Sequence, residues 1–373
     1  MTTVVYAEVF GGSSEVWLHR QVTALGVPLI THDHQNADQF PYKRAHVIPM
    51  RRTWTDRGFG ILRDLNEQHP YHLPVSTERR VRDTLCDLGA DCVHAHFGPA
   101  GILMVPIVRR LACRLVVTFH GFDVGMLPKE VPSYTRALSL LWRQVNHVVA
   151  VSEHVRDRLL ELGCPEDRVE VVRLGVPLRP LRPRSATDRG PVRVLTVARL
   201  TAKKGVPDLV SAVARARADG ASLELDILGD GPERSLVEAR IKAERVEDAV
   251  TLHGLLPPAE VEARLDAADI FVLNSRAGPT GDMEGLPISL LEAMAAGLCV
   301  VSTRHSGIPE AVKHERTGIL VDEHDTDALA RAMATLAEDP GLRIGLGAAG
   351  RVRVESDFDP QKGVARLREI YAG

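Results

Sequence analysis

The sequence has few of the features that mark specialised classes of protein. No stretch approaches the run of about 18 apolar residues that a membrane-spanning helix needs, and residues 1–10 have neither the basic start nor the apolar core of a secretory signal. We therefore expect a cytoplasmic protein. The five cysteines, an odd number scattered along the chain, indicate buried free thiols rather than disulfides or a metal site. The net charge of −3 supplies no basic field, which argues against nucleic acid as a partner.

What the sequence does contain is typical of a two-domain globular protein. Its 373 residues suggest two domains, and 45% apolar with 25% charged residues is an ordinary globular composition. The stretch Pro177–Pro191 is rich in proline and arginine and interrupts all periodicity, as a linker does. We therefore expect domains at 1–178 and 192–355, a linker at 179–191, and a C-terminal helical segment at 356–373.

Each half of the chain alternates apolar strands with helical segments. This alternation predicts an α/β protein in which the parallel sheet of each domain is covered on both faces. The expected strands are 2–8, 91–97, 115–119 and 147–152 in the first half, and 192–200, 223–229, 250–255, 270–275 and 298–303 in the second.

The unit from 270 to 303 has a strand-helix-strand pattern. Its two apolar runs enclose a helix predicted at Leu286–Ala296, with Pro287 in the first turn and Gly297 at the end. Glu292 is the only charge in this helix, whose other residues are apolar on every side. Since a helix of that kind is buried, we expect the Glu292 carboxylate to face protein or ligand and to need a partner.

The loop before this helix is rich in glycine and ends at a helix N-terminus. The free N–H groups of Gly285 and Leu286 at such a terminus are suited to binding a phosphate. Glu284 lies in the same loop, eight residues before Glu292. A glutamate in a surface loop and a core glutamate paired with a neighbouring helix form the alternative interpretation.

Two cations flank the end of the predicted strand 192–200. Arg199 lies at the carboxyl end of the strand, and Lys204 lies in the loop that follows. A guanidinium fork and an ammonium point charge in these places can clamp a diphosphate from two sides. Two surface cations that flank a turn are the alternative.

Histidines gather at the strands of the first half. His94 and His96 share one face of strand 91–97, and His120 and Asp123 follow the next strand. Because ligands bind open parallel sheets at the carboxyl ends of the strands, these side chains are candidates for a ligand site. Zinc needs such a cluster, but uncharged histidines can also contact sugar hydroxyls, and we favour a site without metal. For His120 an ordinary core histidine is the alternative.

Two other stretches of the first half leave alternatives open. The turn at 11–14 can cradle a phosphate at Gly12, or it is a plain strand-to-helix turn. A group of basic and apolar residues can form a surface for a membrane-linked acceptor, or it belongs to a solvated helix. The group is Arg51, Arg52, Trp54, Arg57, Phe59, Ile61 and Leu62.

Three motifs together resemble one family. The text EGLPISLLE, from Glu284 to Glu292, resembles the E-x7-E motif of retaining GT-B glycosyltransferases of family 4, the group 1 glycosyltransferases. The resemblance implies that Glu284 holds hydroxyls of the donor sugar and that Glu292 holds the nucleotide ribose. FHGFD is similar to the family's H-G-x-D element and implies that His120 meets the donor sugar or its phosphates. The family's R-x4-K pair implies that Arg199 and Lys204 stabilise the leaving diphosphate.

The resemblance also implies a fold and a wider site. GT-B proteins have two Rossmann-like parallel-sheet domains that face each other across a cleft, and their C-terminal helix crosses back onto the first domain. The nucleobase is expected at the backbone of His253, Gly254 and Leu255. The text SSEVWLHRQVTAL resembles the opening of the colanic-acid branch, which makes units of extracellular polysaccharide.

The implied activity is transfer of a hexosyl group from a nucleoside diphosphate sugar, with UDP the first expectation, to a hydroxyl with retained anomeric configuration. The acceptor is expected to be a glycan, a lipid-linked sugar, or a small molecule such as an aminocyclitol antibiotic precursor. A lipid-linked acceptor implies peripheral contact with the inner face of the membrane. No D-x-D motif stands in a suitable setting, so we expect neither a metal nor another cofactor. A GT-B epimerase or phosphorylase and a non-catalytic sugar-binding scaffold subunit are the alternatives.

Overall fold

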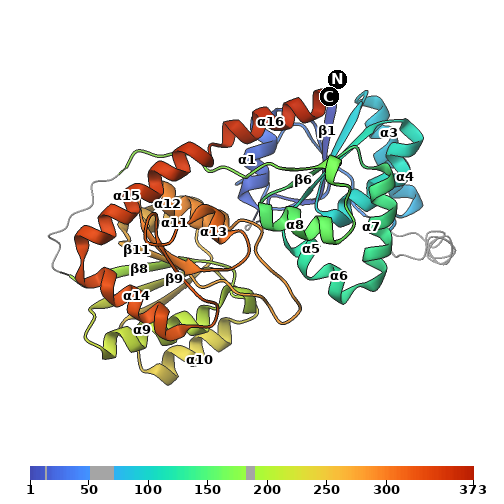
Figure 1. Ribbon diagram of the computed structural model, residues 1–373. Coiled ribbons are helices and arrows are strands. Elements are labelled where there is room, and N and C mark those ends of the chain that lie inside the picture. The colour runs from blue at the N-terminus through green and yellow to red at the C-terminus, as the bar shows by residue number, and fades with distance from the viewer. Residues whose placement is uncertain (13–14, 51–70, 182–189) are drawn as a thin grey trace. The chain divides into compact units, whose positions relative to one another are not determined.

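The chain divides into two compact units (Figure 1). The computed structural model describes residues 1–12, 15–50, 71–181 and 190–373. Unit 1 comprises Met1–Leu174 with Pro360–Gly373, and unit 2 comprises Gly175–Asp359. The basic and apolar group between 51 and 62, suggested above as a membrane-facing surface, lies outside the described residues.

Unit 1 contains a parallel sheet with the strand order β3-β2-β1-β4-β5-β6-β7. Its strands are β1 (Thr3–Phe10), β2 (Leu29–His34), β3 (Ala45–Val47), β4 (Cys92–His96), β5 (Arg114–Phe119), β6 (His147–Ala150) and β7 (Val169–Val171). Its helices are α1 (Val16–Leu25), α3 (Val75–Asp87), α4 (Gly98–Leu111), α5 (Phe122–Gly125), α6 (Leu127–Glu130), α7 (Pro132–Gln144), α8 (Glu153–Glu161) and α16 (Pro360–Ala372), with a 3-10 turn η1 (Glu166–Arg168).

The last helix of the chain is part of the unit 1 core. Val364, Leu367 and Ile370 of α16 pack against residues of β4, β5 and β6. The Tyr371 hydroxyl lies 2.7 Å from His94 Nδ1, although 277 positions separate the two residues. The central strand β4 is buried along its whole length, as expected of a parallel strand that helices cover on both faces.

Unit 2 contains a second parallel sheet, with the order β10-β9-β8-β11-β12-β13. Its strands are β8 (Val192–Val197), β9 (Leu223–Leu228), β10 (Val250–Gly254), β11 (Ile270–Leu273), β12 (Cys299–Thr303) and β13 (Ile319–Val321). Its helices are α9 (Val206–Ala218), α10 (Arg234–Glu244), α11 (Pro258–Ala267), α12 (Ile288–Ala295), α13 (Ile308–Ala311), α14 (Thr326–Glu338) and α15 (Pro340–Asp357), with a 3-10 turn η2 (Ala202–Lys204).

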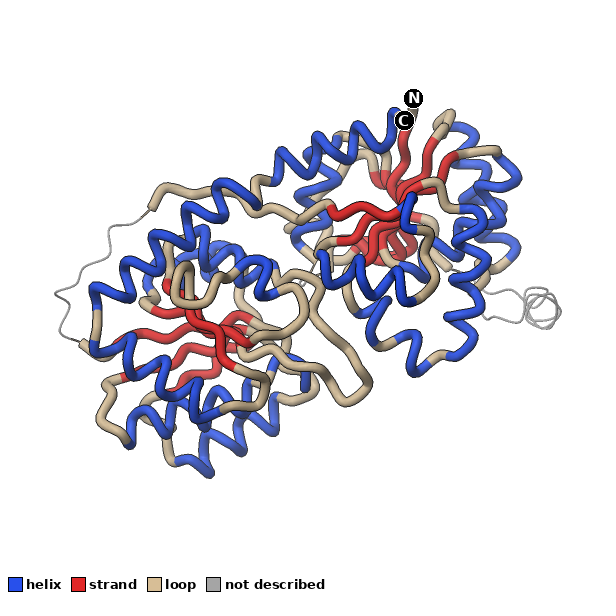
Figure 2. Tube along the Cα trace, viewed as in Figure 1, coloured by secondary structure: helices blue, strands red, loops and turns tan. Residues whose placement is uncertain are grey.

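Two apolar clusters cover the two faces of this sheet. One joins α9, α10 and α14 to the strands, and the other joins α11, α12 and α13 to them. Figure 2 shows the strands at the centre of each unit with helices on both sides. The prediction of an α/β protein with two covered parallel sheets is therefore confirmed.

Several local predictions need correction. The helix predicted from Leu286 begins at Ile288, and Pro287 is the residue before it rather than part of its first turn. The first strand runs on to Phe10 instead of ending near Glu8. All five cysteines are free, but Cys86 is exposed on α3 rather than buried. Within the described residues, no helix combines the length and the apolar character needed to cross a membrane.

Candidate functional site

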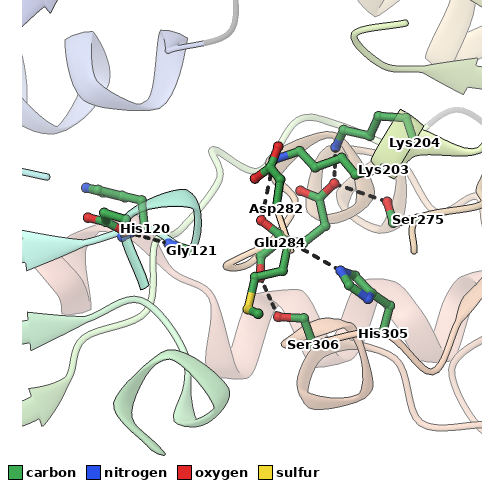
Figure 3. Close-up of polar contacts among 11 residues, drawn as sticks. His120, Gly121, Lys203, Lys204, Ser275, Asp282, Glu284, His305 and Ser306 are labelled. Atoms are coloured by element: carbon green, nitrogen blue, oxygen red, sulfur yellow. Dashed lines mark hydrogen bonds and ion pairs between the residues drawn. The ribbon is translucent and has the colours of Figure 1, made fainter. Parts of the chain in front are cut away.

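A cluster of polar side chains lies at the carboxyl end of the unit 2 sheet (Figure 3). Lys204 is in η2 after β8, Ser275 follows β11, and His305 follows β12. Glu284 comes from the loop between β11 and α12 and reaches all three. In a parallel sheet the carboxyl ends of all strands meet at one edge, which is where such folds bind their ligands.

Glu284 is the buried centre of this cluster. The residue is 7% exposed, and its Oε1 lies 2.6 Å from Lys204 Nζ. The Ser275 hydroxyl donates to the same oxygen at 3.2 Å. Burial by itself raises the pKa of Glu284, but the charges of Lys204 and Lys203, with the hydrogen bond from Lys204, bring that pKa down to about 2. The carboxyl group is therefore ionised at neutral pH.

Neighbouring side chains hold the loop that carries Glu284. Lys203 Nζ lies 3.0 Å from Asp282 Oδ1, so consecutive lysines each pair with an acidic residue of the loop. The Glu284 N–H donates to His305 Nε2 at 3.2 Å, and its carbonyl accepts from the Ser306 hydroxyl. Sequence reasoning did not assign roles to Lys203, Asp282, His305 and Ser306. A polar residue directly after a buried strand was the only signal available for His305.

Three predicted donors have no acceptor among the described residues. Among the described residues, the side chain of Arg199 makes neither a hydrogen bond nor an ion pair, and it is exposed. The N–H groups of Gly285 and Leu286 likewise have no acceptor in the described part of the chain, and both residues are buried. These three groups are available to an anion, whereas Lys204 is already paired with Glu284.

The remaining candidates of unit 2 come from α12 and from the end of β10. Glu292 is half-buried on α12, along a face that it shares with Ile288 and Ser289, so the expectation of a helix buried on every side is wrong for this face. Gly254 ends the edge strand β10 with a φ of 74°, and Leu255 after it is 65% exposed. Among the described residues, no backbone hydrogen bond joins Gly254 or Leu255 to Glu284.

The histidines of unit 1 lie in a row along β4 and after β5, where the rings of His96 and His120 are stacked. His94 and His96 are fully buried, and His96 Nδ1 lies 3.2 Å from His120 Nε2. Burial lowers the pKa of His94 and of His120 to about 3 and that of His96 well below its ordinary value, so all three are neutral. The indole of Trp17 covers His120 at 4.4 Å between ring centroids. His120 itself is half-buried, so it is accessible in part.

Asp123 fixes the turn that carries His120. Its Oδ1 accepts from the N–H groups of His120 and Gly121, and its Oδ2 accepts from the N–H of Gly98, each at 3.0 Å. Burial raises the pKa of Asp123 to about 6, against these backbone hydrogen bonds, which lower it. Within the described residues, no group of three or more His, Cys, Asp or Glu side chains is arranged to hold a metal ion.

The glycine turn of unit 1 requires glycine at one position, while the predicted role of Gly12 at a phosphate stays a prediction. Gly11 has a φ of 81°, and a Cβ there would collide with the carbonyl oxygen of Gln35. At Gly12 the nearest atom to an added Cβ is 3.6 Å away, which is ordinary contact. The structure therefore requires glycine at Gly11, and Gly12 is open to substitution.

Comparison with known proteins extends over both units. Residues 179–353 match the family described as Glycosyl transferases group 1, and residues 59–179 match Glycosyltransferase Family 4. The chain is 38% identical to the putative colanic acid biosynthesis glycosyltransferase WcaL of Escherichia coli, over 73% of this chain and 68% of that protein. It is 35% identical to the amylovoran biosynthesis glycosyltransferase AmsK of Erwinia amylovora, over 75% of this chain and 70% of AmsK. The crystal structure of Anabaena HepE with UDP and glucose superposes with a TM-score of 0.82, 18% identity and full coverage of both chains.

Proposed function

The chain belongs to the group 1 glycosyltransferases of the GT-B fold, and on that premise we propose that unit 2 binds a nucleoside diphosphate hexose. The observation that carries this proposal is the buried pair of Lys204 and Glu284 at the carboxyl edge of the unit 2 sheet, 2.6 Å apart. Arg199, Gly285 and Leu286, which lie close to the pair in the sequence, offer donors that have no acceptor among the described residues. Cations and N–H groups suit a diphosphate, and an ionised carboxylate suits sugar hydroxyls.

The proposed reaction moves the hexosyl group to a hydroxyl of an acceptor with retained configuration. The bond between the anomeric carbon and the diphosphate oxygen breaks, and a bond from that carbon to the acceptor oxygen forms on the same face. Negative charge then develops on the diphosphate, where Arg199, Lys204 and the two N–H groups stabilise it. The acceptor proton passes to a phosphate oxygen of the donor. Because these groups supply positive charge where a metal ion otherwise would, we expect no metal requirement.

The relatives guide the choice of donor and acceptor. HepE was crystallised with UDP and with glucose, which supports UDP as the first nucleotide to test. WcaL and AmsK are named for colanic acid and amylovoran biosynthesis, which supports a growing exopolysaccharide as acceptor over a small aminocyclitol. If that acceptor is lipid-linked, the enzyme works at the inner face of the membrane. The roles of Glu292 at the ribose, of Gly254 and Leu255 at the base, and of His120 at the sugar stay predictions.

Calorimetric titration with UDP, GDP, ADP and TDP in metal-free buffer tests the donor site. We expect one nucleotide to bind in preference, and Arg199→Ala to weaken it by about 1.5–3 kcal/mol, the contribution of hydrogen bonds to a charged group. That loss corresponds to roughly 10- to 160-fold in Kd. Arg193→Ala is the matched control. Arg193 lies in the same strand, β8, but near its amino end, and its guanidinium pairs with Asp269.

Product analysis then separates the enzyme classes. The hexose of the preferred nucleotide should appear on the acceptor, with the same anomeric configuration by NMR spectroscopy. Conversion of the donor with no acceptor present would instead indicate an epimerase, and a requirement for inorganic phosphate would indicate a phosphorylase. Folded protein that binds none of the four nucleotides would refute the donor site and favour a scaffold subunit.

A further inference from the structure

Glu284 is held by its main chain as well as by its carboxylate. The Glu284 N–H donates to His305 Nε2 at 3.2 Å. A main-chain N–H can only donate, so Nε2 of His305 must be the unprotonated ring nitrogen. The proton of the neutral ring is then on Nδ1, which lies 2.7 Å from Glu323 Oε1 and donates to it. The carboxylate of Glu323 therefore selects the one tautomer of His305 that can accept from Glu284.

The same carboxylate holds the other end of the loop. Oε2 of Glu323 accepts from the N–H of Ala277 at 2.8 Å. Glu323 thus fixes the loop 277–284 at both ends, directly at Ala277 and through His305 at Glu284. This second attachment matters because the loop contains Gly278 and Gly281, and glycines leave a chain segment with the greatest conformational freedom.

Backbone strain marks the residue next to His305. Ser306 has a φ of 49°, in the left-handed region that residues other than glycine rarely adopt. Its hydroxyl donates to the Glu284 carbonyl. Strain of this kind persists only where surrounding contacts maintain it, and it concentrates at functional sites. Both main-chain polar groups of Glu284 are therefore bonded to consecutive residues after β12.

This attachment becomes important once a donor enters. The diphosphate proposed above competes with Glu284 for Lys204, so the contact at 2.6 Å that now positions the carboxylate is weakened. The main-chain bond to His305 is unaffected by that exchange, because His305 is 3% exposed and out of reach of a ligand. Together with the bonds from Ser275 and Ser306, it then restrains Glu284 while the sugar is bound.

We propose that His305 and Glu323 are positioning residues for hexosyl transfer, which hold Glu284 against the donor sugar through its main-chain N–H. The inference rests on the proposed function. Neither residue touches the substrate. Their loss should therefore leave the binding of the nucleotide intact, and it should reduce the turnover and the added affinity that the sugar contributes. Misplacement of a positioned group by about 1 Å can cost on the order of 100-fold in rate.

Two substitutions separate the two hydrogen bonds that the His305 ring makes, one with Glu284 and one with Glu323. In His305→Gln the carboxamide oxygen reaches the place of Nε2 and can accept from the Glu284 N–H, but the donor that Nδ1 offered to Glu323 Oε1 is lost. In His305→Asn the amide takes the place of Nδ1 and can donate to Glu323, but the acceptor of the Glu284 N–H is lost. We expect His305→Asn to lower kcat about 10- to 100-fold with the Kd of the nucleoside diphosphate unchanged, and His305→Gln to retain most of the turnover.

A third variant tests the tautomer. Glu323→Gln offers an amide N–H to His305 Nδ1. This favours the tautomer with its proton on Nε2, and that nitrogen can no longer accept from the Glu284 N–H. We expect it to behave like His305→Asn. The control is His314→Gln, because His314 Nδ1 also accepts a main-chain N–H, that of Leu320, at 3.1 Å. This control should keep wild-type turnover.

The measurements are kcat, the Kd of the nucleoside diphosphate, and the Kd of the intact nucleotide hexose, all below the melting temperature of each variant. Wild-type turnover in His305→Asn, or nucleotide affinity that falls together with turnover, would overturn the inference. Equal turnover of His305→Gln and His305→Asn, both reduced, would also contradict it. A wild-type protein that binds no nucleoside diphosphate would refute the proposed function itself, and the inference with it.

Discussion

The buried pair of Lys204 and Glu284 predicts a large and pH-dependent contribution to the stability of unit 2. The pKa of Glu284 falls from its ordinary 4.5 to about 2 in the folded chain. Each pH unit of such a difference is worth about 1.4 kcal/mol, so the ionised carboxylate contributes about 3 kcal/mol at neutral pH. This agrees with the roughly 3–5 kcal/mol lost when one partner of a buried ion pair is removed.

The variant Glu284→Gln should therefore lower the melting temperature of unit 2 at pH 7 by roughly 6–12 °C, taking about 2–4 °C per kcal/mol for a unit of this size. The direction in which this stability changes with pH follows from the lowered pKa of Glu284. The advantage of the wild type is complete above pH 4.5, the unfolded value, and is lost as the pH falls towards 2. Differential scanning calorimetry between pH 7 and pH 2.5 measures it.

A matched substitution distinguishes this pair from ordinary surface charge. Glu238→Gln removes a carboxylate that lies 2.9 Å from Arg234 Nε, with side chains 38% and 47% exposed. Exposed pairs contribute about 0–1 kcal/mol, so this variant should melt within a few degrees of the wild type. Equal melting temperatures for Glu284→Gln and the wild type at pH 7, or a difference that is the same at pH 2.5, would refute the reasoning.

Two further predictions concern unit 1. Gly11→Ala should destabilise the unit by about 1–3 kcal/mol because of its left-handed backbone and its collision with Gln35, whereas Gly12→Ala should change the urea midpoint little; similar midpoints for the two variants would contradict this. Tyr371→Phe removes the hydroxyl that bonds His94 Nδ1 and should cost about 1–3 kcal/mol by leaving a buried ring nitrogen unsatisfied. Faster hydrogen exchange in α16 should accompany that loss, and unchanged protection would count against it.

The two parallel sheets could be predicted from the sequence because the patterns that indicate strands and helices are local. Short apolar runs between amphipathic segments depend on neighbours two to four positions away, and the sheets of both units follow from that alternation. Element ends were less reliable. The two-residue error at the start of α12 arose because Pro287 is compatible both with the first helical position and with the residue before it.

Contacts between side chains that follow different strands could not be predicted in this way, because no local sequence pattern indicates them. The sequence placed Lys204 after one strand and Glu284 before a helix, but their contact depends on β8 and β11 being neighbours in the sheet. His305 and Glu323 stand 18 positions apart in loops after different strands, so their bond is visible only once β12 and β13 are paired. The same limit applies to position 11. Only glycine fits there because the carbonyl oxygen of Gln35, directly after β2, lies where a Cβ would be.

The pairing of Lys204 with Glu284 bears on how donor recognition can work in unit 2. Without a ligand, Lys204 is neutralised by Glu284, whereas Arg199 and the N–H groups of Gly285 and Leu286 have no acceptor among the described residues. A diphosphate that draws Lys204 towards itself leaves the carboxylate of Glu284 short of one partner in a buried site, which is costly. Hydroxyls of a bound sugar can replace that partner, but a free nucleoside diphosphate has none to offer. Recognition of the phosphate and of the sugar should therefore be coupled, with the nucleotide hexose binding more tightly than the nucleotide alone.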